Sequence, residues 1–204
     1  HRARRWWCGH RPETHLISGI RSGMGAFSDT WSVTILIDSK RIFVTGNAGA
    51  GKTTFATNLA EVLGVPFHGL DGIVWQERWR KTPQPEKDAQ IENLISGDAW
   101  IIDGVSDRAM RAAEVVVFLD VPRRVSAVRV IRRNARYLLR SRPGLPPHCP
   151  EVLVIPKLAR LIWRFPRHIR PKILAEKSQR SNESFVHLAW PESGERLIEE
   201  LLLQ

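Results

Sequence analysis

Gly46-Asn47-Ala48-Gly49-Ala50-Gly51-Lys52-Thr53-Thr54 is the stretch that decides the fold. It follows an apolar run, residues 41–45, and precedes a helical pattern, residues 53–63. The glycines allow the backbone to curl so that successive N–H groups point inward and surround phosphate oxygens. A helix that begins where the loop ends turns its positive N-terminus toward the same anion. The spacing G-x-x-x-x-G-K-[ST] between a strand and a helix therefore predicts a phosphate-binding loop.

Two side chains of this loop are expected to act on a bound nucleoside triphosphate. Lys52 is predicted to reach the β- and γ-phosphates, and the Thr53 hydroxyl is predicted to bind Mg²⁺. The whole segment, residues 46–54, is predicted to bind ATP or GTP. The alternative is a glycine-rich turn before an ordinary helix. The presence of every fixed position after a strand-like run favours the nucleotide site.

From Val33 onward, apolar runs and helical patterns alternate, which is typical of an α/β fold with a parallel sheet. The predicted strands are residues 42–45, 66–70, 100–102, 114–119 and 184–188. The predicted helices are residues 53–63, 86–95, a helix after Pro122, residues 151–177 with interruptions at Pro156, Pro166 and Pro171, and residues 192–203. Residues 33–37 fit either an extra strand or an irregular lead-in.

Three aspartates stand where predicted strands end, and ligands of open parallel sheets bind at that edge. Asp103 is a candidate to hold Mg²⁺ through water, together with Thr53. Asp71 is a candidate to bind or deprotonate an acceptor hydroxyl. Asp120 precedes Val-Pro-Arg-Arg, so entry into the next helix is the favoured role for it. For each of them the plainer alternative is a loop acid or a helix cap.

Length and composition favour a single domain with anionic partners. The chain has 204 residues and a formal net charge of +10, which suggests phosphates, nucleic acid or a membrane surface. No apolar run is long enough to span a membrane. Cys8 and Cys149 lie far apart, so two thiols in a reducing compartment, the cytoplasm, are expected rather than a disulfide. Residues 1–32 are predicted to be a disordered tail or a mis-annotated extension, and residues 33–204 a single kinase-like domain.

Positive charge is concentrated between Arg123 and Arg180, where only Glu151 and Glu176 are acidic. On the helix after Pro122, an apolar stripe at helical spacing is predicted to face the core: Val125, Val128, Ile131, Ala135 and Leu138. The arginines on the remaining surface are Arg129, Arg132, Arg133, Arg136 and Arg140, and Arg142 follows. Arg132, Arg133 and Arg136 are the catalytic candidates among them, because a polyphosphate would relieve their mutual repulsion. A solvated basic face is the alternative.

Among the aromatic side chains, one pair has two possible roles. Trp75 and Trp79, four residues apart after Asp71, are predicted either to line an acceptor pocket or to pack as a helical pair in the core. Trp163 and Phe165 are predicted to lie in the core.

The chain resembles the adenylate-kinase-like P-loop proteins often labelled DNA topology modulation proteins. The resemblance covers most of residues 41–190 through GNAGAGKTT, HGLDGIVWQERWRKT, WIIDGVSDR, VVVFLDVPR, RRNARYLLRSRPGLPPHCPE and LIWRFPRHIRPKI. It implies a P-loop NTPase three-layer fold, with a five-stranded parallel sheet flanked by helices and a short arginine-rich lid. Adenylate kinases carry Asp-Gly-Phe-Pro-Arg where this chain has Asp103-Gly104-Val105-Ser106-Asp107-Arg108, so the phosphate acceptor stays open.

Two function classes follow. The first is a Mg²⁺- and ATP-dependent phosphotransferase that moves the γ-phosphate to a nucleotide or another small acceptor. The second is a nucleic-acid-associated ATPase or regulatory nucleotide-binding protein, which the positive charge supports. An acceptor pocket near Asp71 favours the first, and a continuous basic surface outside the nucleotide cleft favours the second.

Overall fold

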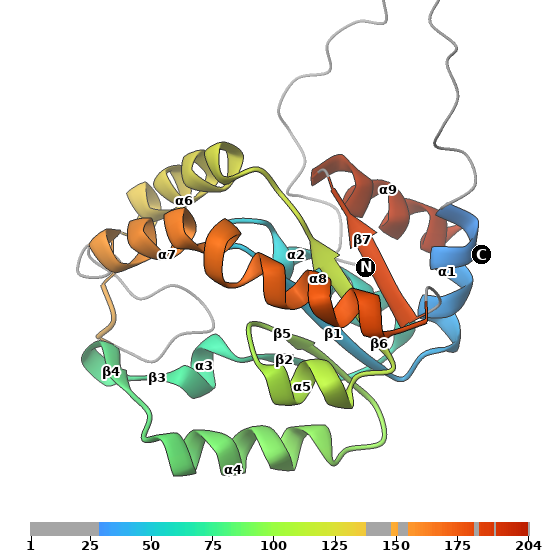
Figure 1. Cartoon of the computed structure of the whole chain (residues 1–204), viewed down its shortest axis with the longest axis horizontal. Helices are drawn as coiled ribbons and strands as arrows, with labels where there is room; N and C mark the ends of the chain where they lie inside the picture. Colours follow the sequence, from blue (N-terminus) through green and yellow to red (C-terminus); the bar gives the residue numbers. More distant parts are fainter. Residues whose placement is uncertain (1–28, 138–147, 151–154, 182–183, 190, 204) are drawn as a thin grey trace, which may run out of the picture.

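The computed structural model describes residues 29–137, 148–150, 155–181, 184–189 and 191–203. Within this part of the chain, five parallel strands form one sheet, in the order β2-β5-β1-β6-β7. The strands are β1 (Arg41–Gly46), β2 (Phe67–Gly69), β5 (Trp100–Asp103), β6 (Val115–Leu119) and β7 (Phe185–Leu188). Because all the pairings are parallel, the carboxyl ends of the strands meet at one edge of the sheet (Figure 1).

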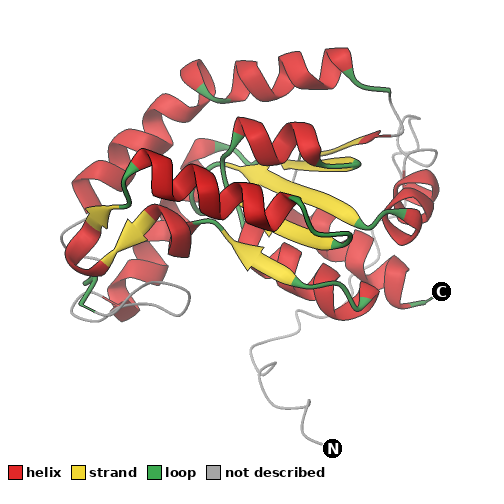
Figure 2. Cartoon of the chain, turned by 90° about the horizontal axis from the view of Figure 1, so that it is seen from below, coloured by secondary structure: helices red, strands yellow, loops and turns green. Residues whose placement is uncertain are grey.

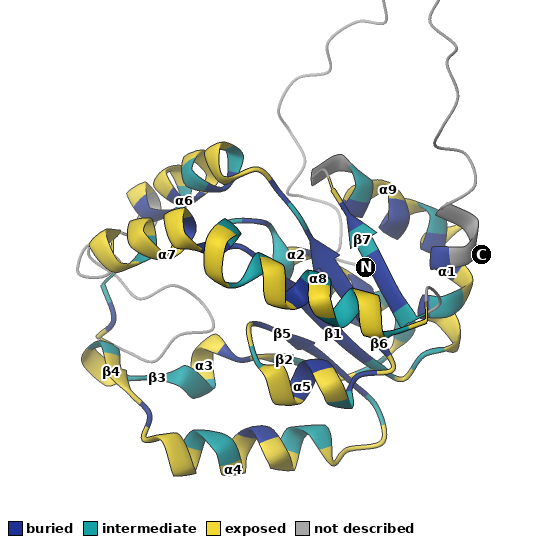
Figure 3. Ribbon diagram, in the orientation of Figure 1, coloured by how far each residue is buried: buried dark blue, intermediate teal, exposed yellow. Residues whose placement is uncertain are grey.

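Helices cover both faces of this sheet and give three layers (Figures 1 and 2). Buried side chains of one face pack against α1 (Asp29–Asp38), α2 (Lys52–Leu63) and α9 (Pro191–Leu202). Those of the other face pack against α4 (Gln84–Ile95), α5 (Asp107–Ala112), α7 (Ile155–His168) and α8 (Arg170–Gln179). The central strands are buried almost throughout (Figure 3), which explains their continuous apolar sequences. The predicted three-layer fold is therefore confirmed.

The segment around residues 33–37 differs from both sequence-based interpretations. It belongs to helix α1, which begins at Asp29, four residues before the predicted domain boundary. Val33 and Leu36 are buried against the sheet, because residues three apart share one face of a helix. The alternation of apolar and polar residues there is too short to distinguish a strand from a helix turn.

The region after β2 holds a short hairpin that the sequence pattern does not indicate. Asp71–Val74 forms α3, and β3 (Trp75–Gln76) then pairs with β4 (Arg80–Lys81) across the 3₁₀ turn Glu77–Trp79. Trp75 and Trp79 are thus not a helical pair; their rings meet edge to face with centroids 5.4 Å apart. The Trp79 indole donates to the Pro150 carbonyl at 2.9 Å. The hairpin therefore contacts the segment that follows the predicted lid.

Helix α6 (Arg123–Tyr137) presents a different face to the core from the predicted one. Ser126, Val130 and Asn134 are buried, whereas Val128 and Ile131 of the predicted stripe are 47% and 68% exposed. Small and polar side chains lie inward because α6 packs against the phosphate-binding loop. Leu138, Arg140 and Arg142 lie outside the described residues, as does most of the predicted arginine-rich lid.

Helix α7 also corrects one prediction. Phe165 is buried, as expected, but Trp163 is 61% exposed. Its ring lies under the guanidinium of Arg123, 4.2 Å from the carbon of that group, so Trp163 joins α6 and α7 at the surface. None of the described helices has the length and apolar character that a membrane crossing requires.

Candidate active site

The loop between β1 and α2 has the backbone that its glycines predict. Gly49 and Gly51 have φ angles of 81° and 97°, in the left-handed region that favours glycine. A Cβ atom on Gly49 would lie 2.5 Å from the Ser126 carbonyl oxygen of α6. One on Gly46 would lie 2.6 Å from the Leu119 carbonyl oxygen of β6. The loop is thus glycine-rich both to curl and to approach its neighbours closely.

The first turn of α2 is arranged to receive an anion. The helix begins at Lys52, and its N-cap residue Gly51 supplies no side-chain cap to the first N–H groups. The Lys52 ammonium donates to the Asn47 carbonyl at 3.0 Å, so it lies over the loop. A phosphate group fits this arrangement because backbone N–H groups, a helix N-terminus and a lysine converge on it.

Thr53 and Asp103 meet at the carboxyl edge of the sheet. The Thr53 hydroxyl donates to Asp103 Oδ2 at 2.5 Å, and Asp103 is only 7% exposed. The parallel register pairs Asp103 with Val44 and so sets the carboxylate beside the loop. Two hard oxygen donors next to a phosphate site are ligands of the kind that Mg²⁺ takes, with phosphate oxygens and water filling its other positions. The residues present therefore fit a Mg²⁺–nucleotide complex.

Asp71 lies on the same side of the sheet, although less deeply. It is the first residue of α3 and is exposed. Its neighbour Leu70 donates its N–H to the Asp103 carbonyl at 2.9 Å, which ties the start of α3 to the end of β5. Leu70 is also why residue 104 is glycine, since a Cβ there would lie 2.8 Å from Leu70 Cβ.

A cavity of about 490 Å³ lies between α4, α5, α8 and the sheet, and we refer to it as the α4–α5–α8 cavity. Its apolar wall includes Phe43, Leu70, Ile91, Met110 and Ile173. Thr45 also lines it, and Thr45 immediately precedes the phosphate-binding loop. The cavity therefore adjoins the nucleotide site. Trp75, Trp79 and Asp71 are not among its lining residues.

The charged part of this cavity comes from three helices. Lys87 and Asp88 lie on α4, Asp107 and Arg108 on α5 and Lys172 on α8. Arg108 forms ion pairs with Asp88 and Glu92 at 3.7 and 3.6 Å, so much of its charge is balanced within the protein. The two lysines are the cations that remain available to a ligand.

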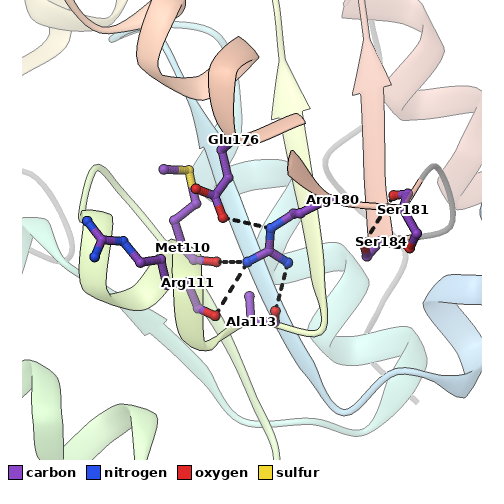
Figure 4. A network of polar contacts seen from close by, with 7 residues as sticks. All are labelled: Met110, Arg111, Ala113, Glu176, Arg180, Ser181 and Ser184. Atoms are coloured by element: carbon purple, nitrogen blue, oxygen red, sulfur yellow. Dashed lines mark hydrogen bonds and ion pairs between the residues drawn. The ribbon is translucent and has the colours of Figure 1, made fainter. Parts of the chain in front are cut away.

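Arg180 fixes the wall that α5 contributes (Figure 4). Its guanidinium donates to the carbonyls of Met110, Arg111 and Ala113, at the carboxyl end of α5, with the Met110 bond at 2.5 Å. The same group pairs with Glu176 at 2.9 Å. Carbonyls at a helix end lack intrahelical donors, so one partly buried arginine satisfies several of them.

Among the predicted arginines, the structure brings a different one to the loop. Arg129 donates to the Ala50 carbonyl at 3.4 Å. Arg132 is exposed and Arg133 is half-buried on the same helix; Arg136 belongs to α6, but its side chain is outside the described part. The sequence places Arg129 on this helix but does not distinguish it from the other arginines. Arg129 lies near the loop because it follows Ser126 by three residues on α6, and Ser126 packs against Gly49.

Asp120 was predicted to act at the start of α6, but its side chain has other partners. Its carboxylate accepts from Arg170 at 2.8 and 3.0 Å, and it lies 3.1 Å from His187 Nε2. Partial burial raises the pKa of Asp120, but the hydrogen bonds and charges of Arg170 and His187 outweigh it and hold the pKa below its usual value. The network joins the ends of β6 and β7 to the start of α8.

No protein-family model matches the chain. A shikimate kinase of Shewanella loihica is 29% identical over 87 residues, which are 42% of this chain and 41% of that protein. The chain is therefore matched to less than half the length of this relative. The structure of shikimate kinase from Bacteroides thetaiotaomicron superposes with a TM-score of 0.50 and 23% identity, over 81% of this chain and 99% of that one. Shikimate kinase from Acinetobacter baumannii, in complex with shikimate, gives a TM-score of 0.48 and 18% identity, over 84% of this chain and 97% of that one.

The fold is that of a P-loop kinase. The likeness extends to the order of layers, with a five-stranded parallel sheet flanked by helices. At this identity it concerns the fold alone. The predicted roles of the site residues and the resemblance to DNA topology modulation proteins stay predictions.

Proposed function

We propose that this chain is a Mg²⁺- and ATP-dependent phosphotransferase that moves the γ-phosphate to a small acceptor. The observation that carries the proposal is the α4–α5–α8 cavity, which adjoins a phosphate-binding loop through Thr45. A simple nucleotide-binding switch needs the loop but has no use for a second site beside it. The volume of about 490 Å³ is within the usual range for small-molecule sites.

The proposed roles follow from the positions of the side chains. Lys52 binds the β- and γ-phosphates, and Thr53 and Asp103 hold Mg²⁺, Asp103 through water. Bound Mg²⁺ neutralises charge that develops on the transferring phosphoryl group. Arg129 contacts the phosphates from α6, and Arg133 and Arg136 follow it on the same helix as further candidates, whereas the exposed Arg132 is assigned no contact. Asp71 does not line the cavity, but it follows the lining residue Leu70, and from this position at the start of α3 it is proposed to bind or deprotonate the acceptor.

The cavity favours an acceptor that is partly apolar and carries an anionic group. Most of its wall is apolar, and Lys87 and Lys172 lie on two of its three helices. A cyclic hydroxy acid or a nucleoside monophosphate has both properties. The kinship with shikimate kinases of the S. loihica type makes the hydroxy acids the first group to test.

A second candidate, a nucleic-acid-associated ATPase, has one observation in its favour. The sequences of α6 and α7 contain no acidic residue. Such a surface attracts any polyanion, including the nucleotide itself, so the charge alone does not select nucleic acid.

An acceptor screen with Mg·ATP tests the proposal. We expect acceptor-dependent release of ADP and a phosphorylated small molecule from a panel of hydroxy acids, sugars and nucleoside monophosphates. Lys52→Ala is the control, because removal of its ammonium weakens nucleotide binding while solvent replaces its bond in the folded loop. Release of ADP that depends on added DNA or RNA, with no acceptor in the panel modified, favours the second candidate instead.

A further inference from the structure

Asn47 joins several hydrogen bonds inside the phosphate-binding loop. Asn47 is only 2% exposed, although it stands at a variable position of the predicted phosphate-binding motif. Its Oδ1 accepts from the Ala48 N–H at 2.8 Å, and its carbonyl accepts from the Ala50 N–H at 3.1 Å. The same carbonyl accepts from the Lys52 ammonium at 3.0 Å. The conformation of the first half of the loop thus depends on where Asn47 is held.

What holds Asn47 lies 115 residues further along the chain. Its amide nitrogen donates to the Ile162 carbonyl of α7 at 3.3 Å. In an unbroken helix this carbonyl would accept from the N–H of residue 166. Residue 166 is proline, which has no N–H, so the helical acceptor is left for another donor. Pro166 therefore creates the acceptor that Asn47 uses.

We propose that Asn47 is a positioning residue, which ties the phosphate-binding loop to α7 through the carbonyl that Pro166 leaves unused. The inference rests on the proposed function for its catalytic meaning, because the loop positioned in this way is the one that binds ATP. Gly49 of the same loop packs on Ser126 of α6. The loop thus contacts both α6 and α7, the helices on either side of residues 138–154.

A physical consequence follows for nucleotide binding. A loop that is already held in its binding conformation loses less conformational entropy when phosphate arrives. Pro166 weakens α7 as a helix, since proline is the least favourable residue in a helix interior. Replacement of Pro166 should therefore stabilise the helix and, by weakening the hydrogen bond to Asn47, also weaken nucleotide binding.

The test compares two prolines of α7. Pro166→Ala restores an N–H that competes with Asn47 for the Ile162 carbonyl, and it leaves the sequence of the loop unchanged. Pro156→Ala is the matched control, because Pro156 is exposed in the first turn, where a helix needs no N–H. Asn47→Ala removes the other partner, and the double variant Asn47→Ala/Pro166→Ala shows whether the two act together.

Two measurements are made on each full-length variant: amide exchange of Ala48 and Ala50 by NMR without nucleotide, and the Kd for Mg·ATP. We expect Pro166→Ala to accelerate exchange of Ala48 and Ala50 and to raise the Kd by about three- to tenfold, the range of one lost hydrogen bond. Asn47→Ala should raise the Kd similarly, and the double variant should add little to it. The thermal stability of Pro166→Ala should not decrease, which separates positioning from a general structural role.

Exchange rates for Pro166→Ala equal to those of the wild type and Pro156→Ala would overturn the inference. Additive effects on the Kd in the double variant would do the same. If the wild type does not bind Mg·ATP, the proposed function fails instead, and the exchange measurement still decides whether Asn47 and Pro166 are linked.

Discussion

Asp103 and Thr53 form the contact on which the proposed chemistry depends most. We predict that Asp103→Asn lowers kcat by about 10²-fold or more, since the carboxylate acts on charge that develops in the transition state. Nucleotide affinity should fall much less, because the loop and Lys52 remain. Steady-state rates across a Mg²⁺ titration, with the Kd for ATP measured in parallel, check this. A variant with the wild-type profile contradicts the role of Asp103 at the metal.

Asp120 provides a prediction on pH. Its pKa is lowered in the folded protein by Arg170 and His187, so its contribution to stability is present above the unfolded pKa of about 3.9 and is lost as the pH falls through the folded pKa. Asp120→Asn should lower the free energy of unfolding by about 1–2 kcal/mol at neutral pH. The difference between wild type and variant should shrink below about pH 4. Chemical denaturation between pH 2.5 and 7 measures it, and a difference independent of pH contradicts this account.

At the residue scale, the sequence predicted which residues lie at the site better than it predicted which side chains they contact. Thr53 and Asp103 could be named because the loop motif and the end of an apolar strand place each at the sheet edge. The partners of Asp120 could not be predicted, since Arg170 and His187 come from elements 50 and 67 residues away. Asn47 stands at a variable position of the loop motif, and the motif does not indicate its partner, because the acceptor is created by a proline far along the chain.

At the scale of elements, the orientation of α6 places its arginines at different distances from the phosphate-binding loop. Arg129→Ala is predicted to lower kcat/KM for ATP by more than about tenfold, because its guanidinium lies at the rim of the loop. Arg132→Ala, on the same helix but exposed, is predicted to lower it by less than about threefold. Steady-state kinetics on the two variants compare identical substitutions three residues apart. The reverse order of effects contradicts the orientation of α6 described above.

Arg180 should stabilise α5 far more than a surface ion pair stabilises its own region. Arg180→Ala removes bonds to three carbonyls and leaves Glu176 without its cation, so the free energy of unfolding should fall by about 2–4 kcal/mol. Arg41→Ala is the control, since Arg41 and Glu114 are 43% and 38% exposed and such pairs contribute about 0–1 kcal/mol. Denaturant unfolding measures both. Equal losses contradict the interpretation that Arg180 holds the cavity wall.

The elements themselves were predictable where one physical signal dominates. The central strands are buried on both faces, so their apolar runs identify them, and Gly64 marks the end of α2 with a left-handed backbone. The buried face of α6 was not predictable, because close packing against Gly49 of the loop brings Ser126 and Val130 inward in place of the predicted apolar stripe. The hairpin after α3 was missed because Arg78 and Trp79 both have positive φ angles, which these residue types rarely adopt.

For the whole molecule, the sheet edge assembles the site from distant segments. The loop, the end of β5 and the start of α3 could be assigned to this edge from the parallel topology. The α4–α5–α8 cavity could not be predicted, because it depends on side chains from the sheet and helices that are far apart in sequence. Its identification as the acceptor site is the central claim.

The most direct test of that claim fills the cavity and measures acceptor-dependent phosphoryl transfer. Val105 lines the cavity and is 53% exposed, so Val105→Trp adds bulk there without disturbing the core. Val128→Trp is the control, on an exposed valine of α6 outside the cavity lining. We predict that Val105→Trp raises the acceptor KM by at least about tenfold, while the Kd for Mg·ATP changes by less than about twofold. Acceptor KM values that are equal in the two variants would contradict the account.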